Sequence, residues 1–385
     1  MRKSLLIALM ALAITPDVAK ALDSCVVPHG QTYTINEHSE CRRVQNNRAT
    51  GLPLMVPTKS AAEWSAGVSS FINATPAGVN VTACPAATGT FTQVASVSLA
   101  RSNPATSTLL DGRVILCGGY NGSYLNRCEI YNPATNTFTQ VANLPQSKTN
   151  ATGDTLNDGR VLMCAGTASG GSQTSRCDTY NPSTNTFTQV ASLPQSKSGM
   201  ASSKLNDGRV IICGGITSSR TNRCDIYNPT TNTFSQVANL PESKNNHSAA
   251  TLLDGRVLFC GGLTTSTTTV SRCDMYNPST NTFTQVASLP GTRSAHGAVT
   301  MNDGSVRICG GRSNSVEAYS GCYLYNSETN TFTTALAMPV AKRAFGNTEL
   351  SDGRILFCAG RTSSNETVRC DILDPGGASS SSCAP

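Results

Sequence analysis

One segment recurs six times along the chain, and this repeat limits the possible folds more than any other feature. Its most uniform part reads CEIYNPATNTFTQVANLP from Cys128 and CDMYNPSTNTFTQVASLP from Cys273. The phenylalanine that opens the FTQV-like part stands at positions 91, 138, 187, 234, 283 and 332, which are 47 or 49 residues apart. A period of this length is typical of a four-stranded blade of a β-propeller.

Each unit contains four short runs that favour β-strands. In the first complete unit these runs are ATSTLL, RVILCGG, RCEIYN and FTQVA, each bounded by Gly, Pro, Asn or Asp. An Asp-Gly turn between the first two runs is a strong hairpin signal. No stretch with helical periodicity interrupts the repeats, so we predict an all-β fold for residues 91–374.

The number of copies predicts how the ring closes. Asp-Gly turns occur six times, but the first FTQV-like strand, Phe91–Val97, precedes the first complete unit, and the last unit lacks such a strand. If Phe91–Val97 supplies the missing fourth strand, six blades close with no unpaired sheet edge between first and last.

The motifs DGRVLFCGG and CDMYNPSTNTFTQV resemble the kelch repeat, in which a double glycine ends the second strand and aromatic residues follow. The likeness covers residues 91–374 and implies a six-bladed kelch β-propeller closed by an N-terminal strand. Phe stands where kelch repeats usually have Trp, and Ala165 and Ala359 replace the first glycine in two units. Kelch propellers include both protein-binding domains and sugar-active enzymes, so the resemblance implies little about chemistry.

Every unit keeps two cysteines, one in the second strand and one in the third. Opposed residues of antiparallel strands are close enough for a disulfide, so we predict one per blade rather than buried thiols or a metal site. The predicted pairs are Cys117–Cys128, Cys164–Cys177, Cys213–Cys224, Cys260–Cys273, Cys309–Cys322 and Cys358–Cys370.

A basic residue follows each phenylalanine by ten positions, in the connection between blades. All length variation falls between the paired cysteines, and alternate connections of a meander lie at one end, so both kinds of loop share a face. We expect this face to carry a ring of cations that binds an anionic ligand; the alternative is that these cations are simply solvated on their loops. The ring comprises Arg101, Lys148, Lys197, Lys244, Arg293 and Lys342.

Other polar residues are expected near the same channel mouth. His247 and His296 would lie side by side on neighbouring blades, where they could bind a ligand or act in acid–base chemistry; packing is the alternative. Arg220, Arg312, Arg343 and Arg361 would add to the basic face, with Arg312 and Arg361 expected at the ligand-binding mouth. Arginines before the second cysteine and acids after it alternate onto one side of the third strand, which predicts scaffold ion pairs; the fifth unit lacks both members, with Gly321 and Tyr323 in their places.

The start of the chain has the features of an export signal. Arg2 and Lys3 precede an apolar run, and Ala19-Lys20-Ala21 is an A-x-A cleavage site, so we predict a signal peptide over 1–21 and a secreted or periplasmic protein. Its removal takes away three cations and one anion and lowers the net charge from +6 to +4. This mild charge gives no indication of nucleic acid binding, and no later stretch predicts membrane insertion.

Residues 22–90 differ from the repeats and predict a small disulfide-containing module. A capping box at Ser60–Glu63 and an apolar stripe through Trp64 indicate one helix. Four cysteines remain outside the blades, and Cys25–Cys41 with Cys84–Cys383 is one of three possible pairings. The Ser-rich residues 375–385 form a tail.

Three functions remain open at this level. We expect a monomeric binding module for an acidic glycan or an acidic protein segment, with a structural surface scaffold as one alternative. The other is a sugar-active enzyme resembling the kelch-type sialic-acid mutarotases. The glycine-rich strands also resemble galactose-oxidase propellers, but that chemistry needs a Tyr–Cys crosslink and Tyr and His copper ligands, and no Tyr-His dyad is present; we expect no cofactor and no metal.

Overall fold

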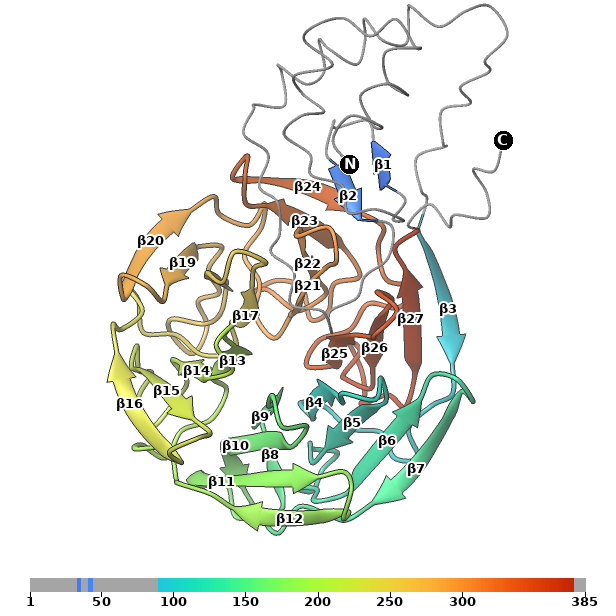
Figure 1. The fold of residues 1–385 in the computed structure, drawn as a ribbon, viewed down its shortest axis with the longest axis vertical. Coiled ribbons are helices and arrows are strands. Elements are labelled where there is room, and N and C mark those ends of the chain that lie inside the picture. The colour runs from blue at the N-terminus through green and yellow to red at the C-terminus, as the bar shows by residue number, and fades with distance from the viewer. Residues whose placement is uncertain (1–32, 36–40, 44–88, 377–385) are drawn as a thin grey trace, which may run out of the picture. The chain divides into compact units, whose positions relative to one another are not determined.

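A computed structural model describes residues 33–35, 41–43 and 89–376. In these ranges all regular secondary structure is β-strand. Residues 87–377 form one compact unit, the propeller, in which six sheets surround a central axis (Figure 1). The all-β, six-bladed prediction is therefore confirmed. Within the described ranges, nothing helical has the length and apolar character that crossing a bilayer requires.

Each blade is an antiparallel meander whose first strand lies nearest the axis (Figure 1). Blade 1 contains β4 (Ala105–Thr108), β5 (Val114–Cys117), β6 (Cys128–Asn132) and β7 (Thr137–Val141). Blade 2 contains β9 (Thr152–Thr155), β10 (Val161–Ala168), β11 (Gln173–Asn181) and β12 (Thr186–Gln189), with β8 (Lys148–Thr149) paired to β10. Blade 3 contains β13 (Ala201–Lys204), β14 (Val210–Cys213), β15 (Cys224–Asn228) and β16 (Thr233–Val237).

The remaining blades repeat this order. Blade 4 contains β17 (Ser248–Thr251), β18 (Val257–Cys260), β19 (Cys273–Asn277) and β20 (Thr282–Val286). Blade 5 contains β21 (Gly297–Thr300), β22 (Val306–Cys309), β23 (Cys322–Asn326) and β24 (Thr331–Ala335). Blade 6 contains β25 (Gly346–Glu349), β26 (Ile355–Cys358), β27 (Cys370–Asp374) and β3 (Thr90–Val94).

Blade 6 closes the ring with strands from both ends of the propeller. β27 pairs antiparallel with β3, so that Leu373 lies opposite Phe91 and Cys370 opposite Val94. The expected circular closure is confirmed. Its physical advantage is that the ladder of β27 is satisfied within the chain and is not an open edge.

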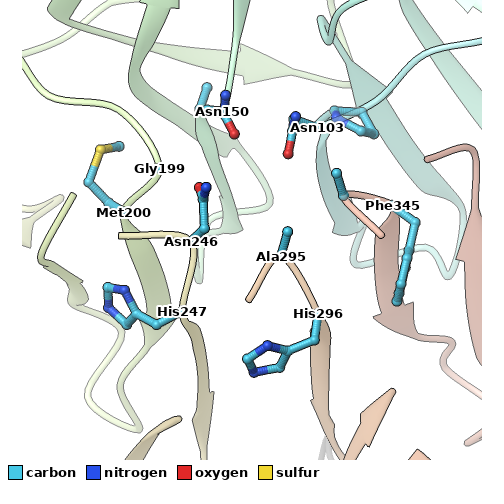
Figure 2. Close-up of a pocket in the computed structure, with 12 residues that line it drawn as sticks. Asn103, Asn150, Gly199, Met200, Asn246, His247, Ala295, His296 and Phe345 are labelled. Carbon is cyan, nitrogen blue, oxygen red and sulfur yellow. The ribbon is translucent and has the colours of Figure 1, made fainter. Parts of the chain in front are cut away.

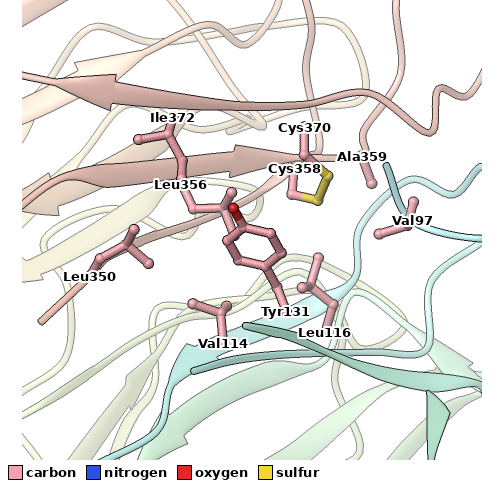
Figure 3. Packing of buried hydrophobic residues seen from close by; sticks show 10 residues of the cluster. All are labelled: Val97, Val114, Leu116, Tyr131, Leu350, Leu356, Cys358, Ala359, Cys370 and Ile372. Carbon is pink, nitrogen blue, oxygen red and sulfur yellow. A yellow bond between two sulfur atoms is a disulfide. The ribbon is translucent and has the colours of Figure 1, made fainter. Parts of the chain in front are cut away.

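The hydrophobic core lies in layers between neighbouring blades. Between blades 1 and 6, Tyr131 and Leu116 of one blade pack against Leu356 and Ile372 of the other (Figure 3). Because strands 2 and 3 are covered on both faces, their residues are apolar in succession: every residue of β5 is buried.

The recurring turn between strands 3 and 4 explains why its sequence is repeated so closely. Asn136 has a left-handed backbone (φ 52°), which Asn tolerates better than most residues. Its side-chain oxygen accepts hydrogen bonds from the Tyr131 hydroxyl (3.1 Å) and from the backbone N–H of Ala95 in blade 6 (2.8 Å). One asparagine thus holds its own turn and ties two blades together.

All six predicted disulfides are present. Their Cα atoms are 4.0 to 4.1 Å apart across strands 2 and 3, and the twelve cysteines are at most 1% exposed.

The two kinds of loop do share a face, as expected. Ser102, in the connection that enters blade 1, pairs with Tyr120 at the start of the loop between strands 2 and 3. Equivalent bridges join Ser198 to Ile216 and Ser294 to Arg312. We call this end of the propeller the loop face.

The leading segment is described only at β1 (Tyr33–Ile35) and β2 (Cys41–Arg43), which pair antiparallel and were not predicted from the sequence. The predicted signal peptide, the helix around Trp64, the tail and the pairing of Cys25, Cys41, Cys84 and Cys383 lie outside what the structure describes.

Candidate functional site

The expectation of an exposed cationic ring is wrong in its geometry. The six basic residues of the repeat are only 0 to 4% exposed, because their side chains run into the blades beneath the loops. Lys148 shows the arrangement: its Nζ donates to the carbonyl of Met163 and lies 3.7 Å from the carboxylate of Asp178. These cations therefore belong to the interior of the scaffold.

In five blades the buried cation shares its carboxylate with a second, more exposed arginine. Asp178 also accepts three hydrogen bonds from Arg176, one from Nη2 at 2.6 Å and two from Nε at 3.0 Å. The same grouping joins Lys197, Asp225 and Arg223. The expected Arg–acid ion pairs are thus confirmed, and burial lowers the pKa of Lys148 and Lys197 to about 8 even with the carboxylate beside them.

Sequence reasoning treated the ring and the ion pairs as separate features, although both have the same period. The cation recurs in all six units, and the carboxylate and the outer arginine recur together in five of them. This shared period indicates a cluster of three residues. A cation in a low-dielectric interior needs a counter-charge beside it, which the carboxylate supplies.

A cavity of about 130 Å³ lies on the propeller axis at the loop face (Figure 2). Two successive residues from each connection between blades line it. The first of each pair has a left-handed backbone with φ between 51° and 66°, and its N–H donates to the carbonyl of the equivalent residue one blade earlier, at 2.6 to 3.3 Å. These residues are Asn103, Asn150, Gly199, Asn246, Ala295 and Ala344, and we call them the axial ring.

The axial ring is closed but not uniform. Asn103, Asn150 and Asn246 carry carboxamides that face the axis in Figure 2, whereas Ala295 and Ala344 have only methyl groups. The asparagines are half-buried, and each carboxamide provides two donors and an acceptor. The asparagine side of the cavity can therefore form hydrogen bonds with a ligand, and the alanine side leaves more room for one.

His247 and His296 line the cavity on neighbouring blades, as expected. Their imidazoles extend between blades: the Cε1 atoms lie against Gly214 and Gly261, close enough that a Cβ on either glycine would clash. His296 Nε2 is 2.9 Å from the hydroxyl of Ser248. Ala201 holds the position equivalent to Ser248 in blade 3, and neither ring nitrogen of His247 has a partner among the described residues.

Burial lowers the pKa of His296 to about 3 and that of His247 well below its usual value. Both imidazoles are therefore neutral at physiological pH, and their packing between blades is a structural role.

The residue directly after the double glycine, or after the Ala-Gly of blades 2 and 6, varies between blades and lies beside the axial ring. It is aromatic in blade 1, apolar in blades 3 and 4, and cationic in blades 5 and 6. The six residues in order are Tyr120, Thr167, Ile216, Leu263, Arg312 and Arg361. In repeats that are otherwise alike, this position makes the loop face asymmetric.

Three arginines of blades 5 and 6 gather at one side of the mouth. Arg343, which precedes the axial-ring residue Ala344, bridges Arg361 by backbone hydrogen bonds. Burial, and the nearby charges of Arg312 and Arg361, lower the pKa of Arg343, while Glu317 opposes this. We call Arg312, Arg343 and Arg361 the arginine cluster.

The cluster has fewer anions than cations. Arg343 forms an ion pair with Glu317 at 2.8 Å, and Arg361 with Glu366 at 2.9 Å. Within the described ranges Arg312 has no such pair. The cluster thus keeps a net positive charge beside the cavity.

Sequence reasoning identified Arg312 and Arg361 but missed Tyr120 and Tyr124 in the adjoining blade. These two rings meet edge to face, with centroids 5.3 Å apart. A hydrogen bond of 3.5 Å from Ser102 to Glu366 connects blade 1 to blade 6, so the aromatic pair and the arginine cluster adjoin. The variation after the double glycine was the signal that could have found them.

The repeats and their closure define a six-bladed β-propeller whose repeats carry kelch motifs; this fold hosts many unrelated functions, so function has to be argued from the site. Comparisons with known proteins agree. Residues 101–145, 205–241 and 245–290 match the kelch motif family. No curated protein matches the chain. A solved structure titled "Structure of YjhT" is similar over 73% of this chain and 96% of that chain, with a TM-score of 0.63 and 13% identity; at this identity the likeness shows the fold alone.

Proposed function

We propose that the protein is an exported binding module that recognises an acidic glycan on its loop face, at the arginine cluster and the adjoining axial cavity. The arginine cluster is the observation that carries the proposal: three guanidinium groups with two carboxylates stand at the mouth of a hydrogen-bonding cavity. Guanidinium groups bind carboxylates and sulfates through paired hydrogen bonds.

The neighbouring chemistry favours a glycan over an acidic protein segment. Tyr120 and Tyr124 offer flat apolar surfaces beside the charge, and three carboxamides offer donors and acceptors for hydroxyl groups. The six disulfides and the signal-like start of the chain support action outside the reducing cytosol, after removal of residues 1–21.

The test is binding to immobilised acidic glycans, with Arg312→Ala as the variant. Arg312 is half-buried and has no ion pair within the described ranges, so its removal leaves no carboxylate unpaired there. We expect affinity to fall by about tenfold or more, the loss typical of one charge-assisted contact. Binding should also weaken as the salt concentration rises.

Arg220→Ala is the matched control, because Arg220 lies in the corresponding loop of blade 3, where its Nε donates to Asn245 at 2.8 Å. This variant should bind like the original protein. Absence of binding to any acidic glycan at low salt, or equal affinity of the Arg312 and Arg220 variants, would contradict the proposal.

A further inference from the structure

Blade 5 keeps the buried cation of the repeat but lacks its carboxylate. In the other five blades a Glu or Asp follows the second cysteine and forms an ion pair with the cation. Tyr323 occupies that position in blade 5, and Arg293 forms no ion pair with any residue the structure describes. Arg293 is nevertheless only 4% exposed. A buried charge without a counter-charge is strongly unfavourable, because its desolvation is not compensated.

Arg101 of blade 1 is a direct comparison, since it holds the same place. Its Nη1 donates to the carbonyls of Gly118 and Arg127, at 3.3 and 2.9 Å, and its Nη2 donates to Glu129. Arg293 is anchored alike, with Nη1 donating to the equivalent carbonyls of Gly310 and Gly321, at 3.0 and 3.1 Å. The two guanidinium groups therefore share one anchor, but Arg293 lacks the carboxylate.

Aromatic rings surround Arg293 where the carboxylate would be. The guanidinium carbon lies 4.9 Å from the ring centre of Tyr319 and 4.8 Å from that of Tyr323. Such contacts stabilise a cation but carry no net charge. The guanidinium group of Arg293 also donates a hydrogen bond to the side chain of Tyr323. Among the described residues the Nε of Arg293 has no hydrogen-bond partner, whereas that of Arg101 donates to Leu99 at 3.2 Å.

Two glycines near Arg293 in the sequence of blade 5 replace larger residues of the other blades. Gly321 stands where the other five blades have the outer arginine, and Gly291 stands where they have Leu, Gln, Glu or Val. A Cβ atom added at either glycine would meet nothing within 4 Å. Blade 5 has thus lost both the anion and the side chains that cover it elsewhere.

We propose that blade 5 contains a binding site for a carboxylate group, in which the ligand enters beside Gly321 and pairs with Arg293 between Tyr319 and Tyr323. The ligand takes the place of the carboxylate that each of the other blades supplies from its own chain. The ligand is expected to be a carboxylate rather than a phosphate, because the equivalent position in the other five blades holds the planar carboxylate of an Asp or Glu. This site lies within blade 5 and uses none of the arginine cluster, so it goes beyond the proposed glycan recognition.

The test is a titration with acetate at constant ionic strength, using chloride for balance, followed by thermal unfolding and calorimetry. We expect a saturable rise in Tm of about 2 °C and a millimolar Kd. Inorganic phosphate, titrated in the same way, should raise Tm less. Arg220→Ala is the control and should respond as the original protein does.

Tyr323→Asp is the decisive variant, since it restores a carboxylate within the chain. It should unfold at a higher temperature than the original protein, because the buried cation gains a partner, and it should no longer respond to acetate. The proposal is overturned if acetate has no effect beyond that of chloride, or if phosphate is the better ligand. It is equally overturned if Tyr323→Asp lowers Tm or keeps the acetate response.

Discussion

At the scale of single residues, equivalent positions of the repeat are not chemically equivalent. Arg101 and Arg293 share an anchor, yet one is neutralised by Glu129 and the other is not. His296 has a hydroxyl partner and His247 has none. Residues that recur in every blade serve the scaffold, which has the same structural need in each blade. A residue that departs from the repeat in one blade is a candidate for ligand binding.

Asp154 of the inner strand β9 is another single departure, since the other blades have Ser, Ala, Val or Thr there. Burial raises its pKa to about 6, although a 2.5 Å hydrogen bond from Ser202 and the charge of Lys204 act in the opposite direction. The folded state therefore binds this proton more tightly than the unfolded chain, whose value is 3.8. The resulting stabilisation is complete below pH 3.8 and is lost as the pH rises through 6.

We expect Asp154→Asn to raise the free energy of unfolding at pH 7 by about 3 kcal/mol and to have little effect near pH 4. Urea unfolding between pH 4 and 7.5 measures this. Asp158→Asn is the control: Asp158 is an exposed turn residue that accepts hydrogen bonds from Arg160, so its replacement should not stabilise at any pH. A gain for Asp154→Asn that does not depend on pH would contradict the assignment.

At the scale of elements, the turn between strands 3 and 4 is the part that the sequence repeats most closely, and its asparagine connects neighbouring blades. In blade 2, Asn185 has φ 54° and accepts hydrogen bonds from the Tyr180 hydroxyl (3.1 Å) and from the N–H of Ala142 in blade 1 (2.8 Å). Its left-handed backbone and its side-chain hydrogen bonds are two separate contributions to the stability of the fold.

Two replacements separate these contributions. Asn185→Gly keeps the left-handed turn and loses the two hydrogen bonds, which should cost about 1 to 3 kcal/mol. Asn185→Ala also strains the turn, so it should cost about 1 kcal/mol more. Chemical denaturation of both variants is the measurement; equal stability of the two would show that the turn conformation contributes nothing.

At the scale of the whole molecule, the ring depends on β3 joining β27. Deletion of residues through Ser96 removes β3 and leaves β27 with an open edge. We expect this truncated protein to have a lower Tm and to associate through that edge, as seen by light scattering. Deletion of residues 1–86 is the control, because it retains every strand of the propeller; a truncation through Ser96 that stays monomeric with an unchanged Tm would contradict this role for β3.

The sequence was sufficient for the blade number, the closure and the disulfides, because each follows from counting positions along one repeat. It was insufficient for the depth of side chains such as Lys148. Spacing places that residue in a connection, but only the packing of the connection against strands 2 and 3 shows that Nζ reaches Asp178. The predicted closure makes blades 1 and 6 neighbours, but spacing alone does not show which of their side chains meet, such as Tyr120 and the arginine cluster.

The closure also fixes where the propeller can be tethered. Thr90 and Asp374 lie opposite each other in blade 6, at the end of the sheet away from the paired cysteines and hence away from the loop face. A linker, anchor or fusion partner joined to β3 or to β27 therefore departs from the rear of the toroid. Immobilisation through either strand would leave the arginine cluster facing the solution, where a ligand can reach it.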